Sequence, residues 1–192
     1  MRAILRINAL ILTLLVPACV NPGTAAQRRL RATSLATDLT SLSKSVHPSE
    51  ATLLAQTAVE ESARLSTEFR PMHIAWLNNN LVNSGVLDRG LCWHWRDDLF
   101  PRLFALKLRT FDLHLASARR GTSLEHNAIV VTPRAGRFEE GIVLDPWRRG
   151  GVLVWKRVAD DRYPWEPLPP ELTPDSLRPL LMPEGKVKHR AR

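Results

Sequence analysis

Apolar side chains recur at helical spacing through the first half of the chain. Residues 48–69 carry five that would share one face: Ala51, Leu54, Ala58, Leu65 and Phe69. Pro48 suits the first turn of this helix, and Pro71 would end it. A second helix is predicted over 72–84, where three apolar residues would face inward: Ile74, Leu77 and Leu81.

A third helix should begin near Leu91, with Cys92 in its first turn. Cys92 opens a stripe with spacings of 3, 4, 4 and 3 residues, which continues through Trp95, Leu99, Leu103 and Leu106. Residues at this spacing share one helical face, so the thiol should face the rest of the protein. Pro101 removes one backbone hydrogen bond, and we therefore expect a kink or break near Asp97.

The second half of the chain has the pattern of strands. Residues 111–116 alternate between apolar and polar, and residues 124–131 become apolar on both faces after Asn127, as in a central strand. Two further strands are predicted over 137–144 and 152–158. Helices followed by hairpin-connected strands predict an α+β fold, with the N-terminal helices packed on an antiparallel sheet.

The two ends of the chain differ from this central region. Residues 1–18 contain an apolar run of eight residues, which suits a signal peptide and is too short for the roughly 20 residues that span a bilayer. Residues 19–33 are polar and basic and are predicted to be a tether, with the folded domain over 34–165. Residues 166–192 are rich in proline and then basic, and we expect a tail that lies over the surface and ends in disorder.

Val16-Pro17-Ala18-Cys19 resembles the lipobox of bacterial lipoproteins. The resemblance implies cleavage before Cys19, lipid on its sulfur, and export to the cell envelope. Val20 offers no aspartate-type signal for retention in the inner membrane, which favours the outer membrane in double-membraned bacteria. An ordinary cleaved signal peptide and a retained anchor helix are the alternatives. If Cys19 is lipidated, Cys92 is the only free thiol.

The composition narrows the choice of partners. The net charge of +8 falls to +6 without residues 1–18, because Arg2 and Arg6 are removed. We attribute the remaining charge to a solvated surface and a basic tail, with weak attraction to anionic lipid or cell-wall polymer as the alternative. An exported protein without a recognition motif is not expected to bind nucleic acid. No CxxC or HExxH spacing is present, and neither a metal nor a cofactor is expected.

Cys92, His126 and Asp145 form a candidate catalytic constellation. If the hairpin between the second and third strands is centred between Ala135 and Gly136, then His126 and Asp145 lie directly opposite on one face of the sheet. A slip of one residue would place them on opposite faces, so the interpretation depends on strand register.

Each of these residue types meets a requirement of thiol chemistry. A helix N-terminus favours the thiolate of Cys92, His126 can accept the thiol proton, and Asp145 can fix the tautomer of the imidazole. N–H groups of the first helical turn can stabilise an oxyanion. A second oxyanion donor should lie upstream of Cys92, with Asn83 or Asn80 as the candidates.

Aromatic residues and other histidines surround this constellation in the sequence. Trp93 and Trp147 are candidates for the lining of a substrate groove, with core packing as the alternative. His94 is a rival base, although it should point to a different side of the helix from Cys92. His114 is expected on the solvent face of a strand.

Three short motifs together resemble the transglutaminase-like branch of the papain-type cysteine enzymes. They are Gly90-Leu91-Cys92 opening a helix, His126 at the start of an apolar strand, and Asp145-Pro146 at the end of the next strand. The resemblance covers approximately residues 72–155. It implies a thiol acyl-transfer site of the peptidase, amidase or transglutaminase type, with Cys92 as nucleophile at the N-terminus of the central helix. A peptide, protein or peptidoglycan-peptide substrate and no obligatory metal are implied as well.

Two other functions fit parts of the pattern. A non-catalytic binding or scaffold lipoprotein would keep the fold and carry a buried, unreactive Cys92. An acyl-CoA-dependent N-acetyltransferase uses cysteine, histidine and aspartate in the same order. The export signal argues against it, because acyl-CoA is a cytosolic metabolite.

Overall fold

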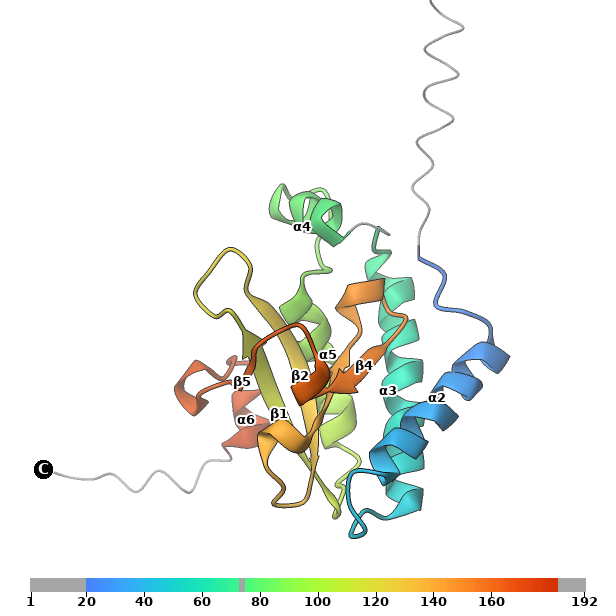
Figure 1. Ribbon diagram of the computed structural model, residues 1–192. Helices are drawn as coiled ribbons and strands as arrows, with labels where there is room; N and C mark the ends of the chain where they lie inside the picture. The colour runs from blue at the N-terminus through green and yellow to red at the C-terminus, as the bar shows by residue number, and fades with distance from the viewer. Residues whose placement is uncertain (1–19, 73–74, 183–192) are drawn as a thin grey trace, which may run out of the picture.

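One antiparallel sheet organises the part of the chain that the computed structural model describes, residues 20–72 and 75–182 (Figure 1). Its strand order is β4-β3-β2-β1-β5, and every neighbouring pair is antiparallel. The strands are β1 (Phe111–Ala118), β2 (His126–Pro133), β3 (Ile142–Asp145), β4 (Val154–Arg157) and β5 (Trp165–Pro167). The predicted α+β class is confirmed.

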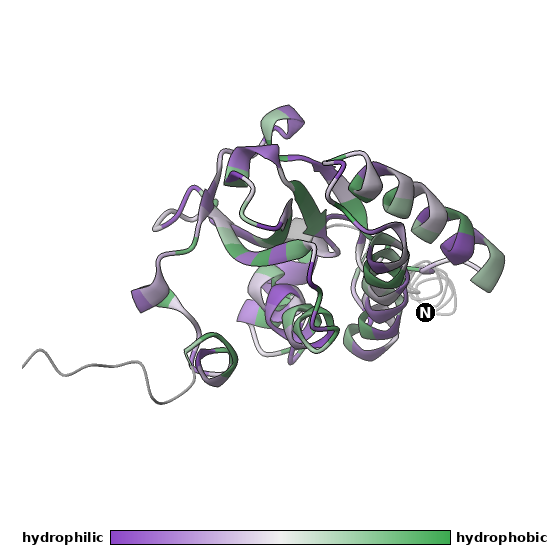
Figure 2. Cartoon of the chain, turned by 90° about the horizontal axis from the view of Figure 1, so that it is seen from below, coloured by the Kyte–Doolittle hydropathy of each residue, from purple (hydrophilic) through white to green (hydrophobic). Residues whose placement is uncertain are grey.

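Helices cover one face of this sheet (Figure 1). They are α2 (Ala25–Thr40), α3 (Pro48–Phe69), α5 (Cys92–Phe104) and the short α6 (Arg178–Leu181). A further helix, α4 (Ala75–Asn83), lies beyond one end of the sheet and contacts the turn Trp147–Arg149 (Figure 1). Among them α5 contacts β2, α3 contacts α5, and α2 contacts α3. Figure 2 shows hydrophobic residues on the central strands and on the helix sides that face them. Within residues 20–72 and 75–182, no helix has both the length and the apolar character needed to cross a membrane.

The periodic pattern predicted two of the helices well. α3 spans the predicted residues 48–69, and its apolar stripe is buried. α5 begins at Cys92 and buries the predicted stripe from Trp95 to Leu103. It continues through Pro101 to Phe104, so the helix is not split at the proline. One missing backbone donor is tolerated because the packed stripe on both sides of the proline holds the helix together.

Residues 25–33 were predicted to belong to a tether and instead form the first half of α2. Thr24 caps the helix: its hydroxyl accepts the N–H of Gln27 at 3.3 Å, and the side chain of Gln27 accepts the N–H of Thr24 at 2.8 Å. The helix buries three side chains against α3 and the sheet: Ala32, Leu35 and Leu39. The tether prediction is wrong from residue 25 onward, because a polar composition does not exclude a helix with one narrow apolar stripe.

Part of the predicted C-terminal tail also belongs to the domain. β5 pairs with β1, and Pro167 ends it at the edge of the sheet, where a strand can lose a backbone donor. Leu177 is buried in the main core. The fold therefore continues through at least residue 182, and the basic residues 183–192 lie outside the described part.

Strand boundaries differ from the predicted ones where a turn takes the place of a strand end. Turns have no strong periodic signal in the sequence. Within the predicted strand 137–144, Phe138–Glu140 forms a 3-10 helix and pairing starts at Ile142.

In α4, Asn78 is buried while Leu77 and Leu81 are only partly covered. The predicted inward face of this helix is therefore incorrect in part, and Ile74 lies outside the described residues.

The turn after β3 is held directly against α3. The hydroxyl of Ser66 donates to the carbonyl oxygen of Gly150 at 2.6 Å. Gly151 has a φ of +97°, and a Cβ on it would lie 2.4 Å from Cβ of Ser66. Only glycine fits this position, which fixes the path of the chain just after Asp145.

Replacing Gly151 with alanine should lower the free energy of unfolding by about 3 kcal/mol or more, because backbone strain and steric overlap combine. Gly121→Ala is the matched control, since Gly121 has a φ of +77° but open space around it. The control should lose only about 1–2 kcal/mol. Denaturant unfolding measures both values. Equal losses of free energy in the two variants would contradict the prediction. They would mean that α3 moves to accommodate the added methyl group at no energetic cost.

Candidate functional site

The three residues of the candidate constellation meet at one end of the sheet. Cys92 is the first residue of α5, His126 is the first of β2, and Asp145 is the last of β3. Their exposed fractions are 8%, 2% and 0%. The sulfur of Cys92 lies 4.0 Å from the carbonyl oxygen of Glu125 and 3.8 Å from Nδ2 of Asn127, the two neighbours of His126.

His126 and Asp145 are joined by a short hydrogen bond. Nε2 of His126 lies 2.5 Å from Oδ2 of Asp145. The predicted direct opposition of the two residues is wrong, because Ile129 pairs with Leu144 and the register is offset by two positions. The 3-10 helix before β3 causes this offset. Side chains alternate with a period of two, so the pair still shares one face of the sheet and the imidazole bridges the gap.

The protonation of His126 is set by two neighbours of its ring, Asp145 and Cys92. Nδ1 is buried and has no hydrogen-bond partner among residues 20–72 and 75–182. Burial lowers the pKa of His126, but the hydrogen bond and charge of Asp145, together with the nearby Cys92, outweigh burial and raise that pKa to about 9. The imidazole is therefore protonated at neutral pH, which places a cation beside Cys92.

Three aromatic rings enclose the imidazole of His126. Their centroids lie 4.6 Å (Trp147), 4.7 Å (Tyr163) and 5.2 Å (Trp165) from the centroid of the histidine ring. Aromatic faces attract cations, so this enclosure favours the protonated form as well. Trp147, predicted to line a substrate groove, thus contacts His126 itself, and its indole N–H donates to Oδ1 of Asn79 at 3.3 Å.

Asp145 is also held by Arg148, which the sequence analysis did not identify. Nε of Arg148 donates to Oδ2 of Asp145 at 2.6 Å, and its other nitrogens bind both carboxylate oxygens of Asp161. Trp165 donates to Asp161 at 2.9 Å. Burial raises the pKa of Asp161, but the hydrogen bonds from Arg148 and Trp165 outweigh burial and lower it below its ordinary value. With His126 protonated, two cations balance two buried carboxylates.

The segment before Cys92 is fixed through the carbonyl oxygen of Gly90. This oxygen accepts hydrogen bonds from Nδ2 of Asn78 at 3.0 Å and from the indole N–H of Trp95 at 3.1 Å. Gly90 has a φ of +130°, and a Cβ there would lie 2.8 Å from Nδ2 of Asn78. A glycine two residues before the cysteine therefore allows α4 to position the start of α5.

His94, the rival base, has a structural task on the same segment. Its Nδ1 accepts the backbone N–H groups of Gly90 at 3.1 Å and Leu91 at 3.2 Å. Burial, followed by the charge of Arg89, lowers the pKa of His94 to about 4. A neutral ring that already accepts two hydrogen bonds has no free nitrogen in this position for the thiol proton of Cys92.

Three other predicted residues are not brought to the thiol. Asn83 is exposed at the last residue of α4, and no hydrogen bond links it to Cys92 in the described structure. Asn80 is exposed in the same helix. Trp93 is 43% exposed, packs against His94 in a tilted arrangement with ring centroids 3.7 Å apart, and lines a separate hollow of about 500 Å³ beside α5.

Asn127, in contrast, reaches the thiol and was missed as a site residue. It is buried, its Nδ2 lies 3.8 Å from the sulfur of Cys92, and the same nitrogen donates to Oε1 of Glu125 at 3.2 Å. Its Oδ1 accepts a hydrogen bond from Nη1 of Arg96. The only sequence signal was the adjacency of Asn127 to His126.

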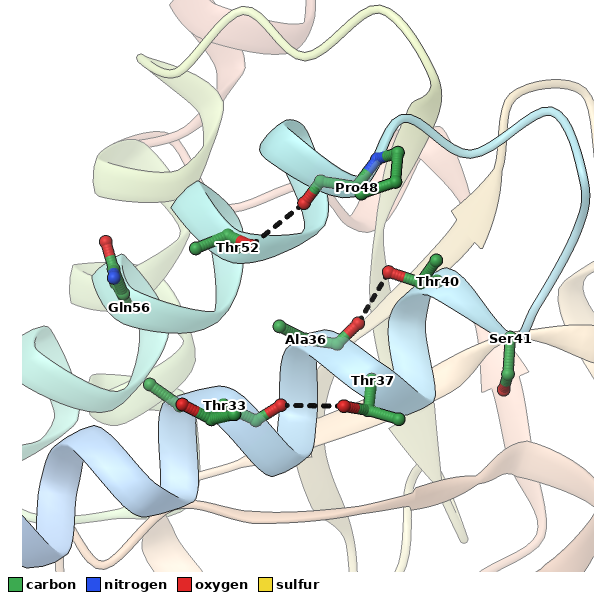
Figure 3. A pocket seen from close by; sticks show the side chains of 9 residues that line it. Thr33, Ala36, Thr37, Thr40, Ser41, Pro48, Thr52 and Gln56 are labelled. Carbon is green, nitrogen blue, oxygen red and sulfur yellow. Dashed lines mark hydrogen bonds between the residues drawn. The ribbon is translucent and has the colours of Figure 1, made fainter.

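A hollow between α2 and α3 is separate from this site (Figure 3). Nine residues line it, and none belongs to the constellation. The hydroxyls of Thr37, Thr40 and Thr52 donate to carbonyl oxygens one turn earlier in their own helices, at 3.1, 2.7 and 2.9 Å. These hydroxyl groups already donate within their own helices. The hollow therefore adds no group to the site around Cys92. Within the described ranges, no group of three or more metal-binding side chains gathers.

The pKa values of the two buried histidines should be shifted in opposite directions, upward for His126 and downward for His94. The imidazole of His126 should keep its proton through about pH 8, whereas His94 should stay neutral above about pH 5. The contribution of protonated His126 to the free energy of unfolding is therefore fully present below its unfolded pKa of about 6.5. It is lost as the pH rises through about 9. NMR titration of the ring protons measures both midpoints. A midpoint for His126 at or below 6.5 would contradict the charge balance described above.

Comparisons with protein-family models, with curated proteins and with solved structures find no match for this chain. The functional argument therefore depends on the geometry of the residues themselves.

Proposed function

We propose that this protein is a cell-envelope lipoprotein whose α+β domain carries a thiol-dependent acyl-transfer site for peptide or amide bonds. The observation that supports this most is that the two ring nitrogens of His126 have different surroundings. Its Nε2 is bound to Asp145 at 2.5 Å, its buried Nδ1 is left without a hydrogen-bond partner in the described structure, and Cys92 lies near the ring. This division of the two ring nitrogens suits a base that exchanges a proton with a thiol.

In the proposed reaction, Cys92 acts as a thiolate beside the imidazolium of His126, which holds the proton on Nδ1. The thiolate attacks the carbonyl carbon of the substrate, and the oxyanion forms at the N-terminus of α5. His126 returns its proton to the leaving amine, which gives a thioester on Cys92. Water or a second amine then attacks the thioester, with His126 as general base, so that the site acts as a peptidase, amidase or transglutaminase.

The helix-first order and the nucleophile at the start of α5 also support a finer proposal, that the domain is transglutaminase-like. The competing proposal is a non-catalytic binding or scaffold lipoprotein, and the 8% exposure of Cys92 favours it. Burial alone does not decide between them, because a substrate can reach a thiol through the small part of it that is exposed. Reactivity of the thiol decides the question.

Iodoacetamide should label Cys92 in the native full-length protein at pH 7, and His126→Gln should slow this reaction at least about ten-fold. Glutamine can still donate to Asp145 but carries no positive charge to stabilise the thiolate. His114→Gln is the matched control, because His114 is a partly buried histidine that contacts Thr132 elsewhere on the sheet. Peptide mapping separates label on Cys92 from label on Cys19. Labelling of Cys92 only after denaturation would favour the binding protein.

The membrane anchor is proposed from the lipobox, whose residues lie outside the described structure. Val20 follows it directly, and the N–H of Val20 donates to the carbonyl oxygen of Pro71 at 3.3 Å. Lipid on Cys19 would therefore hold the domain close to the membrane, without the long tether that the sequence suggested. The outer membrane is favoured over the inner membrane in double-membraned bacteria.

Cells that express the protein should incorporate labelled palmitate into it, and Cys19→Ala should abolish the incorporation. Cys92→Ala serves as the control and should leave the label in place, because only the lipobox cysteine is expected to be modified. Gel analysis after metabolic labelling measures the result. Label that persists in Cys19→Ala would refute the anchor.

A further inference from the structure

The side-chain amide of Asn127 lies against the sulfur that would react. Nδ2 of Asn127 is 3.8 Å from Sγ of Cys92, and the residue is 6% exposed. Asn127 follows His126 in β2, and neighbouring strand residues point to opposite faces of the sheet. The thiol is therefore approached from two sides, by the imidazole from one face and by the amide from the other.

The orientation of this amide is fixed by its neighbours. Arg96 has only donors and binds the oxygen of Asn127, while the carboxylate of Glu125 binds its nitrogen at 3.2 Å. Both contacts require the same assignment of oxygen and nitrogen, so the N–H₂ group faces Cys92. Arg96 is itself buried and is held by Asp97 at 2.7 Å. The donor is thus oriented before any substrate arrives.

We infer that Asn127 is a catalytic residue that donates to the oxyanion of the acyl-transfer reaction, an inference that rests on the proposed function. The sulfur of Cys92 forms a bond to the carbonyl carbon, and the π electrons of the carbonyl move to its oxygen. That oxygen is attached to the same carbon as the sulfur, within reach of Nδ2 of Asn127 and of the N–H of Cys92. When the intermediate collapses, the electrons return and the amine leaves with a proton from His126.

Asn127 thereby fills the place for which Asn83 was predicted. The donor comes from the strand that carries the base and not from the helix upstream of Cys92. Its two donor hydrogens serve different partners: one is held by Glu125, and the other is directed to the thiol. A donor that is prearranged in a buried site needs no reorganisation when the charge develops, which is the condition for strong stabilisation.

Two reactions of the same thiol separate this role from a structural one. Iodoacetamide alkylates sulfur by displacing iodide from a saturated carbon, so no oxyanion forms. p-Nitrophenyl acetate acylates sulfur through an oxyanion and releases nitrophenolate. In the full-length protein, Asn127→Ala should slow acylation of Cys92 about 100-fold, while alkylation stays within about three-fold of the wild-type rate. The alkylation rate also reports whether the site has kept its shape.

Asn127→Asp is the second variant, because the carboxylate keeps the size of the side chain and the contact with Arg96 but has no donor at neutral pH. Its acylation should fall at least as far as that of Asn127→Ala. Equal losses in acylation and alkylation for the alanine variant would overturn the inference, because Asn127 would then only position the thiol. Unchanged acylation in both variants would overturn it as well. A wild-type Cys92 inert to both reagents would instead refute the proposed function itself.

Discussion

The buried ion network around Asp145 is the interaction on which the rest of the site depends. Oδ2 of Asp145 binds the side chains of both His126 and Arg148, and Arg148 also holds Asp161. The side chains of all four are at most 11% exposed. Removal of one partner from such a group leaves an uncompensated buried charge, which costs about 3–5 kcal/mol. The network is neutral only when His126 is protonated, so its charge balance favours the protonated imidazole.

This network also explains why distant parts of the chain fold together. It joins the start of β2, the end of β3, the turn after β3 and the segment that leads into β5. Tyr163 and Trp165 from that last segment pack on both His126 and the guanidinium of Arg148. The proline-rich region that begins near Tyr163 therefore starts by packing against His126. The prolines limit its backbone freedom, which lowers the entropic cost of holding an irregular segment in place.

Helices and strands that have a clear local periodicity could be predicted from the sequence. The 3.6-residue repeat predicted α3 and the stripe of α5, and the unbroken apolar run from Ala128 to Val131 predicted a central strand. The register of β2 on β3 could not be predicted, because it depends on a 3-10 helix within the connection. The pairing of His126 with Asp145 was still predicted, since an offset of two positions preserves the face. Arg148 and Asn127 were missed because their roles come from contacts that no sequence spacing reveals.

The alternation of a β-strand sets a limit on where such a site can be built. His126 lies on the face of the sheet that carries Ala128 and Val130, whereas Asn127 lies on the face that packs against α5. A thiol over the middle of the strand could contact only one of the two side chains. Cys92 can serve both because β2 begins at His126, so the first turn of α5 meets the end of the strand, where both faces are within reach. The hydrogen bonds that fix Gly90 and start α5 at Cys92 are thus as necessary to the proposed chemistry as the base itself, since a start one turn later would remove the nucleophile from both partners.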